Sequence, residues 1–122
     1  MHRLLVVEDD ASLRKLYEAE FSEAGYVVTC AASGNEALER IRSVPPEVIV
    51  LDIRLGDMNG LDVMRGLLQS HPEIGVVLNS AYPGYKQNFA SWSADSYVVK
   101  SSDLTELKSA VAAAVTRRRQ VA

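Results

Sequence analysis

Short apolar runs alternate with helix-like stretches along the whole chain. Five runs rich in branched aliphatic or aromatic residues predict strands, at Leu4–Val7, Val27–Ala31, Val48–Leu51, Gly75–Asn79 and Tyr97–Val99. The run Val48–Leu51 has no polar residue, which is typical of a strand that is buried on both faces in the middle of a parallel sheet. Pro45-Pro46 stops the preceding element, and turn residues follow the strand. Asp52 is therefore expected at the carboxyl end of a central strand.

Helical spacing fills the segments between the strands. The first helix is expected to turn one face inward, made up of Leu13, Leu16, Tyr17, Phe21 and Ala24. Gly25 is placed to end it. Ser33 and Glu36 form a capping box that opens the second helix. The third helix is expected to begin near Gly60, and the last one near Asp103.

The segment from Lys86 to Ser93 carries the weakest helical signal. Its only large apolar anchors are Phe89 and Trp92, and an isolated helix this short is marginal in water. We expect a short or degenerate fourth helix there, and five helices in all. Five alternations of strand and helix predict one α/β domain over residues 1–122, with a parallel sheet between helical layers and right-handed crossovers.

Composition narrows the class of protein. A length of 122 residues suits one domain, and the net charge of −3 lacks the basic excess that direct nucleic-acid binding needs. The single cysteine excludes an internal disulfide and fits a reducing compartment. No stretch approaches the ~18 apolar residues of a membrane span, and the start resembles no signal peptide. We expect a cytoplasmic protein without membrane contact.

Polar residues follow four of the five predicted strands. They are Glu8-Asp9-Asp10, Asp52, Ser80 and Lys100. In a doubly wound sheet these ends lie side by side. Like charges about 4 Å apart repel by ~4 kcal/mol at an effective dielectric of about 20, so a divalent cation and Lys100 are expected to offset the carboxylates. Carboxylate oxygens favour Mg²⁺, and an aspartate nucleophile beside a metal and a lysine indicates phosphoryl transfer.

Each of these residues has a plainer explanation when taken alone. An acidic run before a helix often serves the helix dipole, and Asp52 or Ser80 could be turn residues. Lys100 could be a solvated strand end. It is improbable that four separate strands would end by chance in two acidic groups, a hydroxyl and a lysine. We therefore favour a shared site.

These stretches together resemble the receiver domain of two-component response regulators. The resemblance covers the whole chain and rests on Leu5–Asp10, Val50–Leu55 with Gly60, Ser80-Ala81 and Tyr97–Lys100. It implies a flavodoxin-like fold with strand order 2-1-3-4-5. It also implies that Asp52 accepts a phosphoryl group from the phosphohistidine of a sensor histidine kinase or phosphotransfer protein, and passes the signal to an unknown output partner or domain.

The resemblance further implies a ligand set for Mg²⁺, with Mn²⁺ able to substitute. Asp9 would bind the ion directly and Glu8 through water. Asp52 and the backbone carbonyl of Arg54 would complete the protein's share. Such a domain is a phosphoacceptor that assists its own phosphotransfer and dephosphorylation, and we expect no enzyme in the usual sense.

Three residues are implied to respond to phosphorylation. Lys100 would pair first with Asp52 and then with the phosphoryl oxygens. The hydroxyl of Ser80 would turn toward the phosphate, and Tyr97 would change rotamer in response, which alters the surface around strands four and five.

The chain departs from the family at three places. Gly56 stands where the family commonly has proline, which predicts a looser loop after Asp52. Ser101 follows Lys100 where the family usually has a cis proline, and since a cis bond before another residue costs ~2.5–4 kcal/mol, we predict a trans Lys100–Ser101 peptide. The segment 82–93 is shorter and less helical than the family's fourth helix, which helps form the family's output and dimer face, so the family's output partner and the mode of any homodimer are not carried over.

The alternatives are a receiver-like binding module and an enzyme of similar topology. A receiver-like binding module that works without phosphorylation would normally lack Asp9, Asp52 or Lys100, and none is missing. A dehalogenase-type phosphatase needs a second aspartate where this chain has Arg54, and the acidic run after the first strand would repel the phosphate of a flavodoxin cofactor. The sequence slightly favours a stand-alone regulator, and names neither signal nor output.

Overall fold

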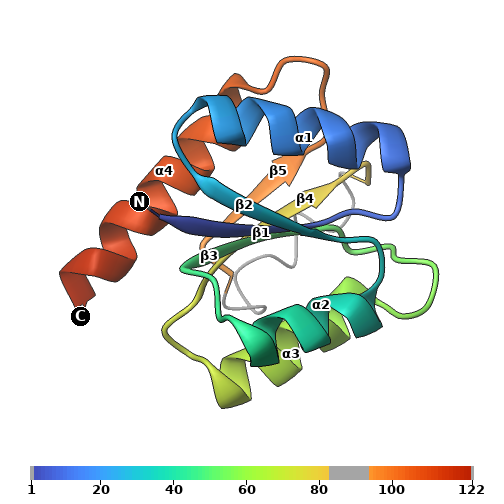
Figure 1. Cartoon of the computed structure of the whole chain (residues 1–122), viewed down its shortest axis with the longest axis vertical. Coiled ribbons are helices and arrows are strands. Elements are labelled where there is room, and N and C mark those ends of the chain that lie inside the picture. The colour runs from blue at the N-terminus through green and yellow to red at the C-terminus, as the bar shows by residue number, and fades with distance from the viewer. Residues whose placement is uncertain (1, 83–93, 122) are drawn as a thin grey trace.

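All five predicted strands form one parallel sheet (Figure 1). In the computed structural model they are β1 (Arg3–Val7), β2 (Val27–Ala31), β3 (Val48–Leu51), β4 (Gly75–Ser80) and β5 (Ser96–Val99). The order is β2-β1-β3-β4-β5, which confirms the predicted flavodoxin-like topology. The structure describes residues 2–82 and 94–121, with the side chains of 118–121 excepted.

Helices cover both faces of the sheet. Within the described residues they are α1 (Ala11–Glu23), α2 (Gly34–Ser43), α3 (Gly60–Ser70) and α4 (Thr105–Val121). Figure 1 shows α1 and α4 on one face and α2 and α3 on the other. The predicted short helix within Lys86–Ser93 lies outside the described residues, and α4 corresponds to the predicted last helix.

The residues of β3 explain why its sequence is continuously apolar. Val48 and Val50 pack into the core beneath α1 and α4, whereas Ile49 and Leu51 pack into the core beneath α2 and α3. All four are at most 1% exposed. Because side chains alternate along a strand, an interior strand between two helical layers needs an apolar residue at every position.

Local capping signals set several helix ends. Ser33 Oγ accepts a hydrogen bond from the Glu36 N–H at 3.1 Å, as the capping box predicts. The Glu36 carboxylate accepts from the Ala32 N–H at 2.5 Å, one residue earlier than the motif predicts. Gly25 follows α1 with a φ of 101°, a conformation that favours glycine.

The predicted inward face of α1 is too wide. Tyr17 and Phe21 are buried, but Leu16 is 43% exposed and Ala24 is also exposed. Each residue turns the helix by about 100°, so Leu16 points roughly a quarter turn away from Tyr17. Ala24 caps the end of the helix, where the chain already turns away from the core.

The last helix begins slightly later than predicted. It starts at Thr105, whose N–H donates to Asp103 Oδ1 at 2.9 Å. No peptide bond in the described chain is cis, and the Lys100–Ser101 peptide is trans as predicted. Among the described helices, none is both long enough and apolar enough to cross a membrane.

Candidate phosphorylation site at the carboxyl edge of the sheet

The strand register brings the predicted site residues to one edge of the sheet. The last residues of β1 and β3, Val7 and Leu51, are direct partners, so Glu8 and Asp52 follow at the same level. The Asp52 N–H donates to the Val7 carbonyl at 3.2 Å. Residues from separate parts of the chain thus meet because their strands run parallel and end together.

A lysine joins two carboxylates at this edge. Lys100 Nζ lies 2.9 Å from Asp52 Oδ2 and 2.6 Å from Glu8 Oε1. The side chains of Glu8 and Asp52 are only 2% and 7% exposed. The pairing of Lys100 with Asp52 follows the expectation, whereas the second contact, with Glu8, was not foreseen. One cation therefore faces two buried anions.

This imbalance perturbs the acid–base behaviour of the cluster. Burial raises the pKa of Glu8, and the opposing attractions of Lys100 and of the Asp10 N–H do not fully offset it. Burial by itself would lower the pKa of Lys100, but hydrogen bonds to Glu8 and Asp52 outweigh that effect and raise it. The cluster retains a negative charge that a further cation would stabilise.

The acidic residues fit the donor set of a hard divalent cation. Glu8, Asp9 and Asp52 each offer a carboxylate oxygen, and these oxygens lie within 4.8 Å of one another. Glu8 and Asp52 are buried, whereas Asp9 is exposed. Mg²⁺ typically binds one or two carboxylates, retains several waters and leaves room for a phosphate oxygen. The geometry is consistent with that coordination.

The loop after Asp52 is anchored at both of its ends. The Arg54 N–H donates to Asp52 Oδ1 at 3.2 Å, which orients the carboxylate and the neighbouring backbone. The Gly60 N–H donates to the Ile53 carbonyl at 2.6 Å. A Cβ at Gly60 would overlap the backbone carbonyl of Asp52, so this close approach requires glycine.

Tyr82 connects the hydroxyl residues of the site. Ser80 is fully buried, and its Oγ accepts from the Tyr82 N–H at 3.1 Å. Tyr97 is 5% exposed, and its hydroxyl donates to the Tyr82 carbonyl. The Tyr82 ring lies 3.7 Å from Arg54 Cζ, measured to the ring centroid. Sequence patterns alone assign no role in the site to Tyr82, although it stands only two residues after Ser80.

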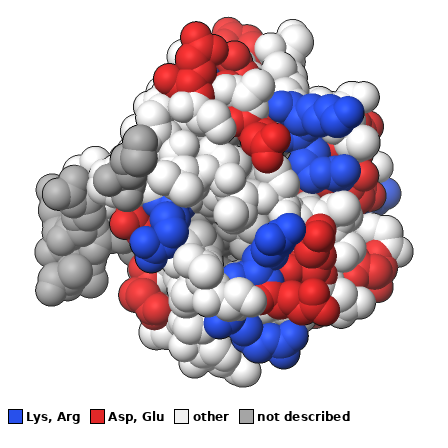
Figure 2. Space-filling model, in the orientation of Figure 1, with Lys and Arg blue, Asp and Glu red and all other residues white. Residues whose placement is uncertain are grey.

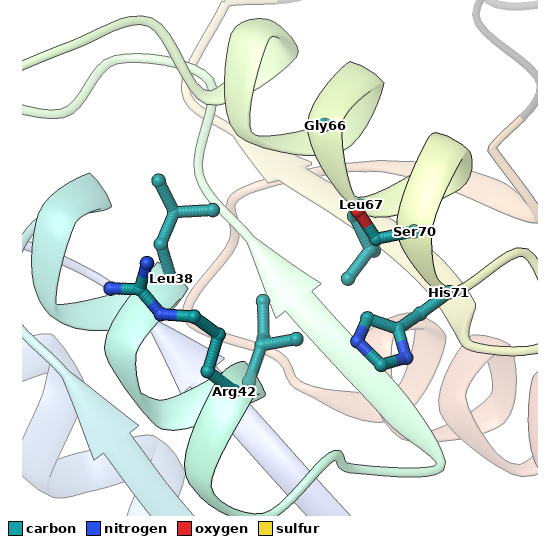
Figure 3. Close-up of a pocket in the computed structure, with 7 residues that line it drawn as sticks. Leu38, Arg42, Gly66, Leu67, Ser70 and His71 are labelled. Carbon is teal, nitrogen blue, oxygen red and sulfur yellow. The ribbon is translucent and has the colours of Figure 1, made fainter.

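A separate pocket lies between α2 and α3 (Figure 3). It measures ≈ 210 Å³, with Leu38 and Arg42 on one side and Gly66, Ser70 and His71 on the other. No carboxylate occurs among the described residues that line it. Because a hard cation prefers oxygen ligands, this pocket lacks the donor chemistry of the carboxyl edge.

The surface charge is mixed. On the face drawn in Figure 2, acidic and basic side chains are interspersed, and no broad basic area forms among the described residues. This pattern agrees with the slightly negative net charge of the chain.

The sequence matches the response regulator receiver domain family over residues 4–112. Among solved structures, the response regulator TrrA from Thermotoga maritima, in complex with Mg²⁺-BeF, is 36% identical with a TM-score of 0.88. The alignment covers 93% of this chain and 99% of TrrA. TrrA in complex with the histidine kinase ThkA gives a TM-score of 0.86, covering 94% of this chain and 99% of TrrA.

Curated relatives are longer than this chain. The probable transcriptional regulatory protein TcrX of Mycobacterium tuberculosis is 33% identical over 106 residues, which are 85% of this chain and 45% of TcrX. The matched region of the luminescence regulatory protein LuxO of Vibrio campbellii is 17% of that protein. The match that spans residues 4–112, together with the sheet order and the gathered acidic edge, shows that the chain belongs to the response regulator receiver domain family.

Proposed function

We propose that residues 1–122 form a phosphorylation-dependent switch in which Asp52 is the phosphoacceptor. The observation that carries this proposal is the placement of Asp52, a nearly buried carboxylate held by Lys100 on one oxygen and by the Arg54 N–H on the other. Carboxylates are competent nucleophiles toward phosphorus when nearby cations neutralise the charge that builds up.

The reaction exchanges one bond to phosphorus for another. An oxygen of Asp52 forms the new O–P bond while the N–P bond of a donor phosphohistidine breaks, and the histidine nitrogen keeps the electron pair. Glu8, Asp9, Asp52 and the Arg54 carbonyl would hold Mg²⁺, or Mn²⁺ in its place. The ion supplies neutralisation of phosphoryl oxygens. Hydrolysis later restores Asp52, so the chain is a phosphoacceptor and not a conventional enzyme.

Lys100 contributes the protein's own positive charge. In the resting arrangement its ammonium group contacts Glu8 and Asp52. After phosphorylation, one of its N–H groups binds a phosphoryl oxygen, which forms a charge-assisted hydrogen bond. Lys100 therefore holds the nucleophile before transfer and stabilises the product after it.

Ser80 and Tyr97 transmit the change. The phosphoryl group adds roughly −1.5 to −2 charges and new acceptor oxygens. Ser80 then gives up its bond with the Tyr82 N–H and donates to the phosphate. Because Tyr82 also accepts from Tyr97, its movement alters the Tyr97 contact and the surface near β4 and β5. Coupling of this kind typically amounts to ~1–3 kcal/mol.

The donor is a sensor histidine kinase or a phosphotransfer protein, a proposal that the complex of TrrA with ThkA supports. The output is another domain or protein, and we assign no direct nucleic-acid binding to this domain. The lone cysteine fits a cytoplasmic location. A homodimer is a further assembly to test.

The deciding experiment is intact mass spectrometry after incubation with acetyl phosphate and Mg²⁺. Wild type should gain the mass of one phosphoryl group, whereas Asp52→Asn should gain none, and chelation of Mg²⁺ should abolish the gain. A gain in both proteins would show that a residue other than Asp52 is the nucleophile. No gain in either, together with no Mg²⁺ binding, would favour the module that works without phosphorylation.

A further inference from the structure

Asp57 fastens the loop after Asp52 to a different part of the chain. One of its carboxylate oxygens accepts from the Gly34 N–H at 2.9 Å, and the other accepts from the Asn35 N–H at 2.9 Å. Both donors lie in the first turn of α2, where backbone N–H groups have no partner within the helix. The hydrogen bonds from Asn35 and Gly34 hold the pKa of Asp57 below its usual range, so it stays ionised at neutral pH.

Met58 provides a second contact between the same two segments. A Cβ placed on Gly34 would overlap Cγ and Sδ of the Met58 side chain. The loop therefore lies directly against the start of α2, and glycine at position 34 permits this approach. Two adjacent residues of the loop therefore contact the start of α2, Asp57 through hydrogen bonds and Met58 through its apolar side chain.

The remaining contacts of the loop restrain its base and not its tip. The pairing of Arg54 with Asn59 and the Gly60–Ile53 hydrogen bond close the base of the loop. Between them, Gly56 has open space around it and adds no restraint of its own. Here the sequence predicted a looser loop because proline is missing. The contact of Asp57 with α2 restrains the loop in place of the proline that this chain lacks.

We propose that Asp57 is a positioning residue for Mg²⁺, which holds the Arg54 backbone carbonyl in place by fastening its loop to the N-terminus of α2. This inference rests on the proposed function, in which that carbonyl is a ligand. Asp57 is not one of the proposed ligands of the ion, because both of its carboxylate oxygens bind backbone N–H groups of α2. It acts through the backbone, as residues outside a metal's ligand set commonly do when they orient the ligands.

The test is the dissociation constant of Mg²⁺, measured by isothermal titration calorimetry on the unphosphorylated protein. Asp57→Ala should weaken binding about tenfold, the lower end of the range for residues that orient metal ligands. Asp57→Asn keeps one acceptor oxygen and should fall between wild type and the alanine variant. Urea denaturation of each variant measures stability separately.

Two controls separate positioning from general effects. Ser33→Ala removes another cap of α2 and leaves the loop contact intact, so it should lower stability without changing Mg²⁺ affinity. Asp62→Ala removes one negative charge from an exposed pair with Arg65, so it reports how much of the effect is long-range electrostatics.

The outcomes are distinct. If Asp57→Ala lowers stability as Ser33→Ala does but binds Mg²⁺ within about twofold of wild type, Asp57 is only a helix cap and the inference is overturned. An equal loss of affinity in Asp62→Ala would also overturn it. If wild type itself binds no Mg²⁺, the proposed function fails, which is a different result.

Discussion

The two sides of the site are built from different chemistry. On the proposed metal-binding side, called the metal side below, Glu8, Asp9 and Asp52 each offer a carboxylate oxygen, and Lys100 contacts the two buried residues, Glu8 and Asp52. On the proposed switch side, called the switch side below, Ser80 and Tyr97 are hydroxyl residues that already have hydrogen-bond partners in the Tyr82 backbone. A bound cation would stabilise the first arrangement, whereas in the proposed switch the second exchanges one hydrogen bond for another.

This difference suits the two tasks. Buried like charges repel, so a bound cation should stabilise the metal side. A neutral hydrogen bond contributes only about 0.5–1.5 kcal/mol, so the switch side can change partners at little cost. We therefore expect substitutions on the metal side to have the larger effects, and those on the switch side to change signalling more than chemistry.

The largest effect is expected from Gly60→Ala, which breaks the metal side. The added methyl group would overlap the Asp52 carbonyl and approach Ile53 Cα, both of them backbone atoms. Overpacking against backbone should lower the free energy of unfolding by about 3 kcal/mol and abolish phosphoryl uptake. Urea denaturation and intact mass measure the two effects. A variant within about 0.5 kcal/mol of wild type would show that the loop yields easily.

A second prediction concerns the pH dependence of stability through Glu8. Its pKa in the folded protein lies above the ordinary value of 4.5, so its stabilising contribution is complete below that value and is lost as the pH rises through the folded pKa. Glu8→Gln cannot ionise. Without Mg²⁺, the stability of the variant relative to wild type should therefore increase from pH 4 to pH 7.

Urea denaturation at several pH values, with and without Mg²⁺, measures the Glu8 effect. Added Mg²⁺ should stabilise wild type more than Glu8→Gln, because the variant lacks one carboxylate of the acidic cluster. A constant difference between the two proteins across this pH range would contradict the role of burial at Glu8.

A smaller effect is expected from Tyr97→Phe on the switch side. The substitution removes the hydrogen bond to the Tyr82 carbonyl and keeps the buried ring, so the free energy of unfolding should fall by about 1 kcal/mol. Phosphoryl uptake by Asp52 should be unchanged in intact mass measurements. If uptake falls as much as it does in Gly60→Ala, the two sides of the site are not separable.

The smallest effect is expected from Gly66→Ala, the matched control for Gly60→Ala on the same helix. A Cβ at Gly66 meets nothing within 4 Å, and the residue lines the pocket between α2 and α3 (Figure 3). Alanine should raise the free energy of unfolding by about 0.5–1 kcal/mol through helix propensity. Mg²⁺ affinity should not change. Destabilisation would mean that the pocket needs its present shape.

Much of the site could be anticipated because its residues sit at strand ends. Asp52 and Lys100 each follow an apolar run, and parallel strands place such ends at one edge. The Lys100–Asp52 contact is the direct result. The roles of Asp9, Glu8, Arg54, Ser80 and Tyr97 remain predictions, and the variants above test those of Glu8 and Tyr97 directly.

Other contacts had no local signal. Glu8 as a second partner of Lys100 depends on how far each side chain reaches across the sheet. The Arg54–Tyr82 contact joins loops from two different strands. Arg117 of α4 pairs with Asp95, which lies just before β5. Such pairs depend on how the elements are placed relative to one another, and the hydrophobic periodicity of a sequence does not specify that placement.

The sequence by itself determined the order and type of the elements in the described chain, the apolar central strand, the capping of α2 and the positions of the polar strand ends. These features follow from periodicity, turn residues and backbone chemistry over a few neighbouring positions. Only the tertiary structure decided that Leu16 stays exposed, that Tyr82 joins Ser80 to Tyr97, and that Asp57 reaches α2. The physical reason is that burial and long-range hydrogen bonds depend on which surfaces the folded sheet and helices bring together.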